Sequence, residues 1–179
     1  MTPSPSPERA DLVGTLRKHR ELFLGTVRDL SDDQARLTPT VSTLSLGGLV
    51  KHVTATESEW QRFIVDGPAG QPDIDWADID WNNPPEAVLA YQNQFRLLEG
   101  ETLADVVAEH HRVAEETERL IATVDLDATQ PLPEAPWFAP GERWTARRTF
   151  LHLIAEVSQH AGHADIIREA VDGQKSMSS

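Results

Sequence analysis

The stretch WTARRTFLHLIAEVSQHAGHADIIREA, residues 144–170, decides the fold of this chain. Apolar residues recur in it at intervals of three and four, which is typical of an amphipathic helix with one buried face. That face consists of Phe150, Leu153, Ile154, Val157, Ala161 and Ala164. We therefore expect one long helix over the whole stretch, with this face packed against other helices of the chain.

A second stripe of side chains follows the border of that apolar face. It consists of His152, Glu156, His160 and His163. Their spacing of i, i+4, i+8 and i+11 places them along one side of the helix. Surface helices usually carry Lys and Glu at such positions, whereas neutral imidazole and carboxylate are ligands of divalent transition ions. The stripe therefore indicates a metal site.

Composition limits the function classes. The net charge of −13 argues against a nucleic-acid partner, because such binding depends on Lys and Arg neutralising phosphates. The chain has no cysteine, which excludes disulfides, Cys-based metal sites and a cysteine nucleophile. Any thiol chemistry must then use a thiol that arrives with a substrate or cofactor. No apolar run approaches the roughly 18 residues that span a bilayer, and the first residues lack a signal-peptide core. We expect a cytoplasmic protein without a membrane partner.

The chain of 179 residues is long enough for one domain with a full core. Residues 1–7 alternate Pro with Ser and Thr and are expected to form a disordered leader. Residues 8–173 are expected to form one helical domain, followed by a tail at 174–179. Helical periodicity or capping signals mark residues 7–30, 31–37, 46–65, 84–98, 103–124 and 144–170. The N-cap candidates are Ser31, Ser45, Thr102 and Thr145. Four long helices predict an all-α four-helix bundle with metal ligands facing inward from two helices.

The helix over 46–65 carries two further candidates. His52 lies at the edge of its apolar face, and Glu57 lies inside that face. An unpaired carboxylate in a core is costly, so Glu57 needs a partner. Two interpretations stay open: Glu57 supports a metal-bound histidine, or it is an ordinary helix-surface glutamate. His19 and His110 lie on apolar stripes of their own helices, and we expect both to be core or rim histidines.

The proline-rich connection over 125–143 is long for a compact domain, as functional lids often are. Trp137 in it would give a ligand an apolar contact. Arg147 and Arg148 in the first turn of the last helix oppose the helix dipole. This mild cost suggests that one of them holds an anionic group, and simple solvation of both is the other interpretation.

Two segments carry a resemblance to a known family. They are SLGGLVKHV at 45–53, followed by Glu57 and Trp60, and LHLIAEVSQHAGHAD at 151–165. These segments resemble the DinB-like superfamily of metalloproteins, especially the actinobacterial branch with mycothiol-dependent maleylpyruvate isomerase and mycothiol S-transferases. The order and spacing of the helices agree over nearly the whole chain. The resemblance implies a four-helix bundle of the up-down-down-up type with long connecting loops, and related bundles often form homodimers.

The resemblance also implies a ligand set. The superfamily site uses a His on the second helix and a His-x3-His pair on the fourth, which fall on His52, Glu156 and His160. Glu156 replaces one His, as in the isomerase branch. His163 is an alternative ligand in place of Glu156, and His152 would line the pocket or orient Glu156. Two ligands from one helix and one from another leave coordination positions open, as in catalytic zinc sites. Zinc is the first expectation, while nickel, iron and manganese also suit nitrogen and oxygen ligands.

Three functions remain open at this point. The first is a metal-dependent transferase that uses a low-molecular-weight thiol, mycothiol or a similar one, as nucleophile on a small electrophile. The metal would stabilise the thiolate, Arg147 or Arg148 would hold the carboxylate or sugar of the thiol, and Trp137 would contact its apolar part. The second is a metal-dependent hydrolase with Glu57 or His163 as general base. The third is a non-enzymatic metal-binding or stress-related module, so enzymatic activity itself stays open.

Overall fold

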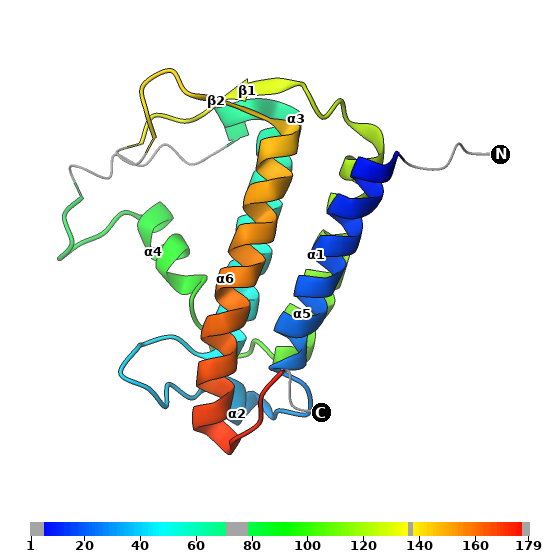
Figure 1. The fold of residues 1–179 in the computed structure, drawn as a ribbon. Coiled ribbons are helices and arrows are strands. Elements are labelled where there is room, and N and C mark those ends of the chain that lie inside the picture. The colour runs from blue at the N-terminus through cyan, green and yellow to red at the C-terminus, as the bar shows by residue number, and fades with distance from the viewer. Residues whose placement is uncertain (1–5, 71–78, 136–137, 177–179) are drawn as a thin grey trace.

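The computed structural model of the chain describes residues 6–70, 79–135 and 138–176. In this part of the chain, four long helices form a bundle (Figure 1). They are α1 (Pro7–Gly25), α3 (Leu46–Asp66), α5 (Leu103–Thr123) and α6 (Ala146–Asp172). The shorter helices are α2 (Asp32–Arg36), η1 (Gly67–Gly70) and α4 (Glu86–Asn93). None of these helices combines the length and the apolarity that a membrane span requires.

The predicted N-caps explain where the helices begin. Ser45, Thr102 and Thr145 each accept a hydrogen bond from the backbone amide three residues further on. Ser31 and Gln34 form a complete capping box at the start of α2. Each cap satisfies amides that have no partner inside the helix, which fixes the first turn.

Three predicted boundaries were wrong. The first helix ends at Gly25 and not at residue 30, because turns follow it and Asp29 adopts a left-handed backbone with φ 61°. The predicted helix over 84–98 shortens to Glu86–Asn93. Trp144 belongs to a strand and not to α6, because the extended backbone of the Thr145 cap precedes the first helical turn.

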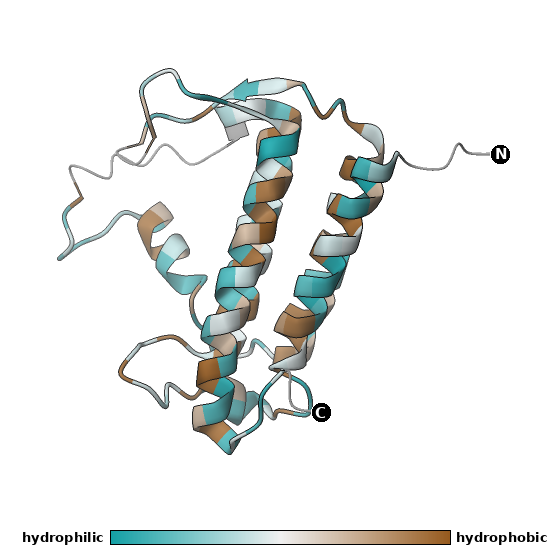
Figure 2. Ribbon diagram, viewed as in Figure 1, coloured by the Kyte–Doolittle hydropathy of each residue, from teal (hydrophilic) through white to brown (hydrophobic). Residues whose placement is uncertain are grey.

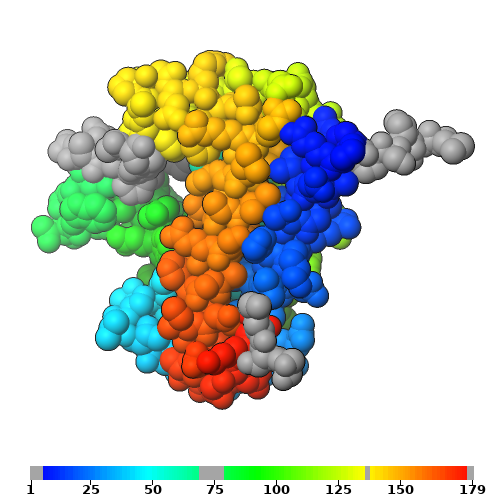
Figure 3. Space-filling view, in the orientation of Figure 1, coloured from blue at the N-terminus to red at the C-terminus, as the bar shows by residue number. Residues whose placement is uncertain are grey.

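A small sheet closes one end of the bundle, within the connection that the sequence predicted as a loop. The strands β1 (Thr129–Pro131) and β2 (Arg143–Thr145) pair antiparallel, with Gln130 opposite Trp144. The space-filling view shows the segment around these strands covering the end of α6, while α1 and α6 lie side by side (Figure 3). The sheet thereby places Trp144 at the start of α6.

The helix directions confirm the up-down-down-up bundle. Helices α1 and α6 run in the same direction and contact each other, and α3 and α5 run together in the opposite direction (Figure 1). Helix α3 also packs on α6, and α5 packs on α1. The long connection over 67–102 returns the chain to the end of the bundle where α5 begins.

The core lies where the four apolar stripes meet. Its largest side chains are at most 1% exposed: Phe23 of α1, Phe63 of α3, and Phe150 and Leu153 of α6. Apolar and polar residues alternate around α1 and α6, the two long helices in front (Figure 2). Burying one such side chain stabilises the fold by about 1.5–3 kcal/mol. The fold therefore rests on these stripes, which leaves the polar side chains between the helices available for function.

Candidate functional site

His52 lies on α3 where this helix packs against α6. Its side chain is buried, and its ring lies edge-on to the ring of His160, with centroids 5.0 Å apart and planes at 82°. On its other side, the ring of Phe95 stacks on His52 with centroids 4.1 Å apart and planes at 24°. His52 is therefore held between α6 and the segment that follows α4.

Two glycines at the start of α3 explain how that segment comes so close. A Cβ atom at Gly48 would overlap the carbonyl oxygen of Phe95, and one at Gly47 would overlap the side chain of Leu97. Only residues without a side chain allow residues 95–97 to lie against the helix at these positions. The Gly47–Gly48 pair thus sets the position of the Phe95 ring on His52.

Glu156 lies between two histidines of α6. Its Oε1 is 3.5 Å from Nε2 of His152, and its Oε2 is 3.5 Å from Nε2 of His160. The hydrogen bond with His160 holds the pKa of Glu156 below its usual value, and the nearby charge of His152 acts in the same direction. Glu156 is therefore a carboxylate at neutral pH, beside both rings. The helical spacing of i, i+4 and i+8 predicted this row.

His52 is neutral at physiological pH. Burial, and then the charge of His160, lower the pKa of His52 to about 4. The Nδ1 atoms of His52, His160 and His163 are buried, and none of them has a hydrogen-bond partner among the residues that the structure describes. Imidazoles with unpartnered ring nitrogens beside a carboxylate have the donor chemistry of a site for a divalent transition ion.

The side chains of the candidate ligands lie close together, but their donor atoms do not meet at one point. Over residues 6–70, 79–135 and 138–176, no group of three or more His, Asp or Glu side chains is placed to hold one ion. His52, Glu156 and His160 therefore fit a metal by type and proximity. Rotation of their side chains would be needed to bring three donor atoms to one point.

Aromatic rings surround His152 at the end of this row. Its ring lies 4.9 Å from Trp60 and 5.1 Å from Trp144, centroid to centroid. The two indoles stack on each other at 5.0 Å with planes at 9°, and Phe138 contacts Trp144 edge-on. We call Trp60, Trp144 and Phe138 the aromatic wall. It gives the histidine row an apolar neighbour on the side of the β1–β2 sheet.

The two arginines at the start of α6 have different surroundings. Arg147 forms ion pairs with Glu8 and Asp127, which raise the pKa of Arg147. These ion pairs connect α6 both to α1 and to the loop that follows α5. The guanidinium of Arg148 lies 4.5 Å above the Trp144 ring, and its Nη2 is 3.1 Å from Glu142. Of the two, only Arg148 lies against the aromatic wall. The predicted contact residue Trp137 falls outside the described residues.

The structure does not place Glu57 beside the candidate ligands His52 and His160. This carboxylate is 1% exposed and pairs with Arg20 of α1 and Thr117 of α5, on another side of α3 from His52. The charge in the apolar face is thus explained by a buried ion pair. His163 remains near the site, with its ring 5.5 Å from that of His160. His110 is a core histidine, as predicted, with no exposed surface.

The roles of Phe95 and Trp144 do not follow from the sequence pattern. The helical periodicity includes Trp144 in the last helix, and nothing in the pattern points to Phe95. The adjacent glycines Gly47 and Gly48 were the available signal, because glycine inside a helix often marks the close approach of another segment.

Comparisons with known proteins bear on the family and the fold of the chain. The family model described as Mycothiol-S-transferase matches residues 11–173. Among solved structures, the chain is similar to a conserved protein from Enterococcus faecalis, with a TM-score of 0.60 and 17% sequence identity over 92% of this chain and 97% of that chain. At this identity the likeness supports the fold alone. No curated protein sequence matches the chain. With a match over nearly its whole length, this four-helix bundle belongs to the mycothiol S-transferase family.

Proposed function

We propose that this protein is a metal-dependent transferase that joins a low-molecular-weight thiol of the mycothiol type to a small electrophile. One observation carries the proposal: in a chain of this family, His52 of α3 lies against His160 beside Glu156 of α6. The absence of cysteine supports an external source of sulfur.

His52, Glu156 and His160 are the residues that would hold the metal, with His163 as an alternative to Glu156. A divalent ion bound there supplies Lewis acidity that lowers the pKa of a thiol next to it. Burial keeps His52 neutral, so its lone pair is available at physiological pH. The Phe95 stack narrows the orientations of the His52 ring, so the adjustment that would bring three donor atoms to one ion falls mainly on Glu156 and His160.

In this proposal His152 takes the thiol proton. Burial lowers the pKa of His152, so the ring is neutral at physiological pH. Its Nε2 faces Glu156 as a donor, which leaves the lone pair on Nδ1. A proton accepted at Nδ1 would give an imidazolium that the Glu156 carboxylate stabilises. The sulfur then forms a bond to the electrophilic carbon while the leaving group departs with its electron pair.

The aromatic wall would bind the electrophile. Trp60, which is partly exposed and backed by the buried Trp144, offers apolar surface next to His152, which favours an apolar or aromatic body and excludes water. Arg148 on the far side of Trp144 is half exposed and supplies a positive charge for a carboxylate of either substrate.

A conjugation assay tests this function. Purified protein loaded with zinc is mixed with mycothiol and 1-chloro-2,4-dinitrobenzene, and release of chloride and formation of the thioether are followed. We expect turnover that needs the thiol, falls at least 100-fold in His52→Ala, and is unchanged in the exposed-histidine control His111→Ala. A rate equal to that without protein, for several electrophile classes, would contradict the proposal. Thiol-independent ester hydrolysis would instead support a hydrolase.

A further inference from the structure

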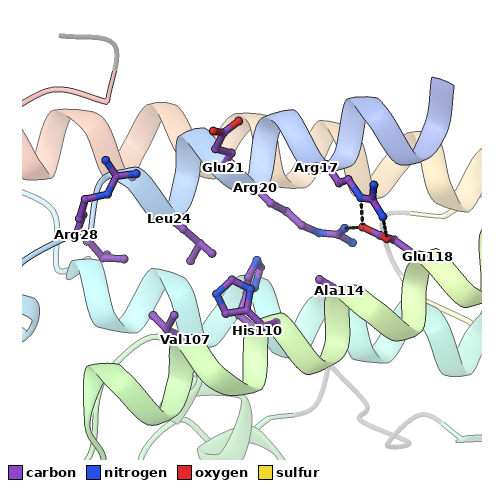
Figure 4. A pocket seen from close by; sticks show the side chains of 12 residues that line it. Arg17, Arg20, Glu21, Leu24, Arg28, Val107, His110, Ala114 and Glu118 are labelled. Carbon is purple, nitrogen blue, oxygen red and sulfur yellow. Dashed lines mark hydrogen bonds and ion pairs between the residues drawn. The ribbon is translucent and has the colours of Figure 1, made fainter. Parts of the chain in front are cut away.

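A cavity of about 470 Å³ lies between α1 and α5, away from the α3–α6 contact that carries His52. Figure 4 shows His110 reaching into it from α5, with Arg20 and Leu24 facing it from α1. Its volume is in the range of small-molecule sites. None of the residues proposed for thiol transfer lines it, so it needs a separate explanation.

His110 presents an unpartnered hydrogen-bond acceptor to this cavity. The hydroxyl of Thr54 donates to the carbonyl of Val50 at 2.7 Å, so its oxygen must accept the 3.0 Å bond from Nδ1 of His110. The proton of the neutral ring is then on Nδ1, and Nε2 carries the lone pair. This Nε2 is fully buried and has no hydrogen-bond partner among the described residues. Burial, with the charge of Arg20, lowers the pKa of His110 to about 3, so the ring stays neutral.

Arg20 presents unpartnered donors to the same cavity. Its side chain is 5% exposed, and its Nη2 pairs with Glu57. Its Nε and Nη1 are buried and make no hydrogen bond in the described part of the chain. Nη1 lies 3.7 Å from Glu118, which is too long for a hydrogen bond. Buried donors without partners are costly, so a ligand that accepts from Arg20 would be favoured.

A hydroxyl group satisfies both requirements, because it donates to Nε2 of His110 and accepts from Arg20. A bare anion would instead face the lone pair of His110. A positive charge is available in the turn after α1, where the exposed Arg28 lines the cavity and forms no ion pair among the described residues. Leu24 and Val107 give the space between these groups apolar sides.

We propose that the α1–α5 cavity binds a small aromatic carboxylate that carries a hydroxyl group at the opposite end of its ring. The hydroxyl lies between His110 and Arg20. The ring packs against Leu24 and Val107, and the carboxylate pairs with Arg28.

A titration followed by amide NMR tests the ligand chemistry. The full-length protein receives 4-hydroxybenzoate, benzoate without the hydroxyl, or phenol without the carboxylate. We expect shifts confined to α1 and α5, with 4-hydroxybenzoate binding at least fivefold more tightly than either partial analogue, since one hydrogen bond changes affinity about threefold to tenfold. No localised shifts would overturn the proposal and leave bound water as the partner of His110. Equal affinities, or shifts around His52, would also overturn it.

Variants test the assigned contacts. Arg28→Gln, at an exposed position that does not endanger folding, should weaken 4-hydroxybenzoate to the level of phenol. His110→Phe, which keeps an aromatic ring but removes Nε2, should weaken it to the level of benzoate. The control Arg112→Gln on the exposed face of α5 and the metal-site variant His52→Ala should bind as the unchanged protein does. Unchanged affinity in Arg28→Gln would contradict the proposal even if His110→Phe fails to fold.

Discussion

The imidazole of His52 lies flat against the phenyl ring of Phe95, with centroids 4.1 Å apart. The stack orients the histidine that we propose as a metal ligand, although Phe95 itself has no donor atom. In Phe95→Ala we expect zinc affinity to fall about tenfold to 100-fold, the range typical of residues that orient ligands. Competition with a chelator of known affinity measures this. Leu89→Ala, which removes an exposed apolar side chain from α4, is the control and should leave the affinity unchanged.

Two glycine substitutions should have opposite effects on stability. In Gly48→Ala the new methyl group would collide with the backbone of Phe95, so we expect the free energy of unfolding to fall by about 1–3 kcal/mol. Gly14 of α1 has open space where a Cβ atom would lie, so Gly14→Ala should raise the free energy of unfolding by about 0.5–1 kcal/mol through helix propensity. Urea unfolding measures both. Unchanged stability in Gly48→Ala would contradict the close approach of residues 95–97, and a loss in Gly14→Ala would contradict the open space beside Gly14.

The Arg20–Glu57 pair should be far more important for stability than a surface pair. Both side chains are at most 6% exposed, so Glu57→Gln leaves a buried guanidinium without its nearest counter-charge. We expect a loss of about 3–5 kcal/mol in the free energy of unfolding. The matched control Glu116→Gln removes an exposed pair with Arg119 and should cost less than about 1 kcal/mol. Equal losses would contradict the buried network.

Acid should destabilise the protein through His110. Its pKa is 6.5 in the unfolded chain and about 3 in the fold, so the unfolded state binds the extra proton between these values. The contribution of the neutral ring is fully present above pH 6.5 and is lost as the pH falls toward 3. Relative to His110→Phe, the protein should lose up to about 1.4 kcal/mol per pH unit in this window. Urea unfolding from pH 7 to 4 measures the difference, and parallel curves would contradict it.

Local signals in the sequence predicted much of the fold. Ser45, Thr102 and Thr145 cap helices as expected, because a cap depends only on its own residue and the next turn. The pairing of β1 with β2 could not be predicted in the same way. Its three-residue strands are too short for a periodic pattern, and their partners are separated by a long loop.

The candidate site was predictable only where one helix carries it. The row from His152 to His160 follows from helical spacing, whereas the stack of Phe95 on His52 depends on how a distant segment packs. Glu57 shows most clearly what a pattern within one helix cannot predict. Its position inside an apolar face indicated a buried partner, but that partner is Arg20 of α1, which no pattern within α3 could identify.

Elemental analysis of the purified, untagged protein tests the metal site most directly. The native protein is measured beside the His52→Ala/His160→Ala double variant, both before and after reconstitution with zinc. We expect about one equivalent of a divalent transition metal in the native protein and none in the variant, with both proteins folded because the apolar stripes hold the bundle together. Native protein that binds no metal even after reconstitution, or a variant that retains it, would contradict the site.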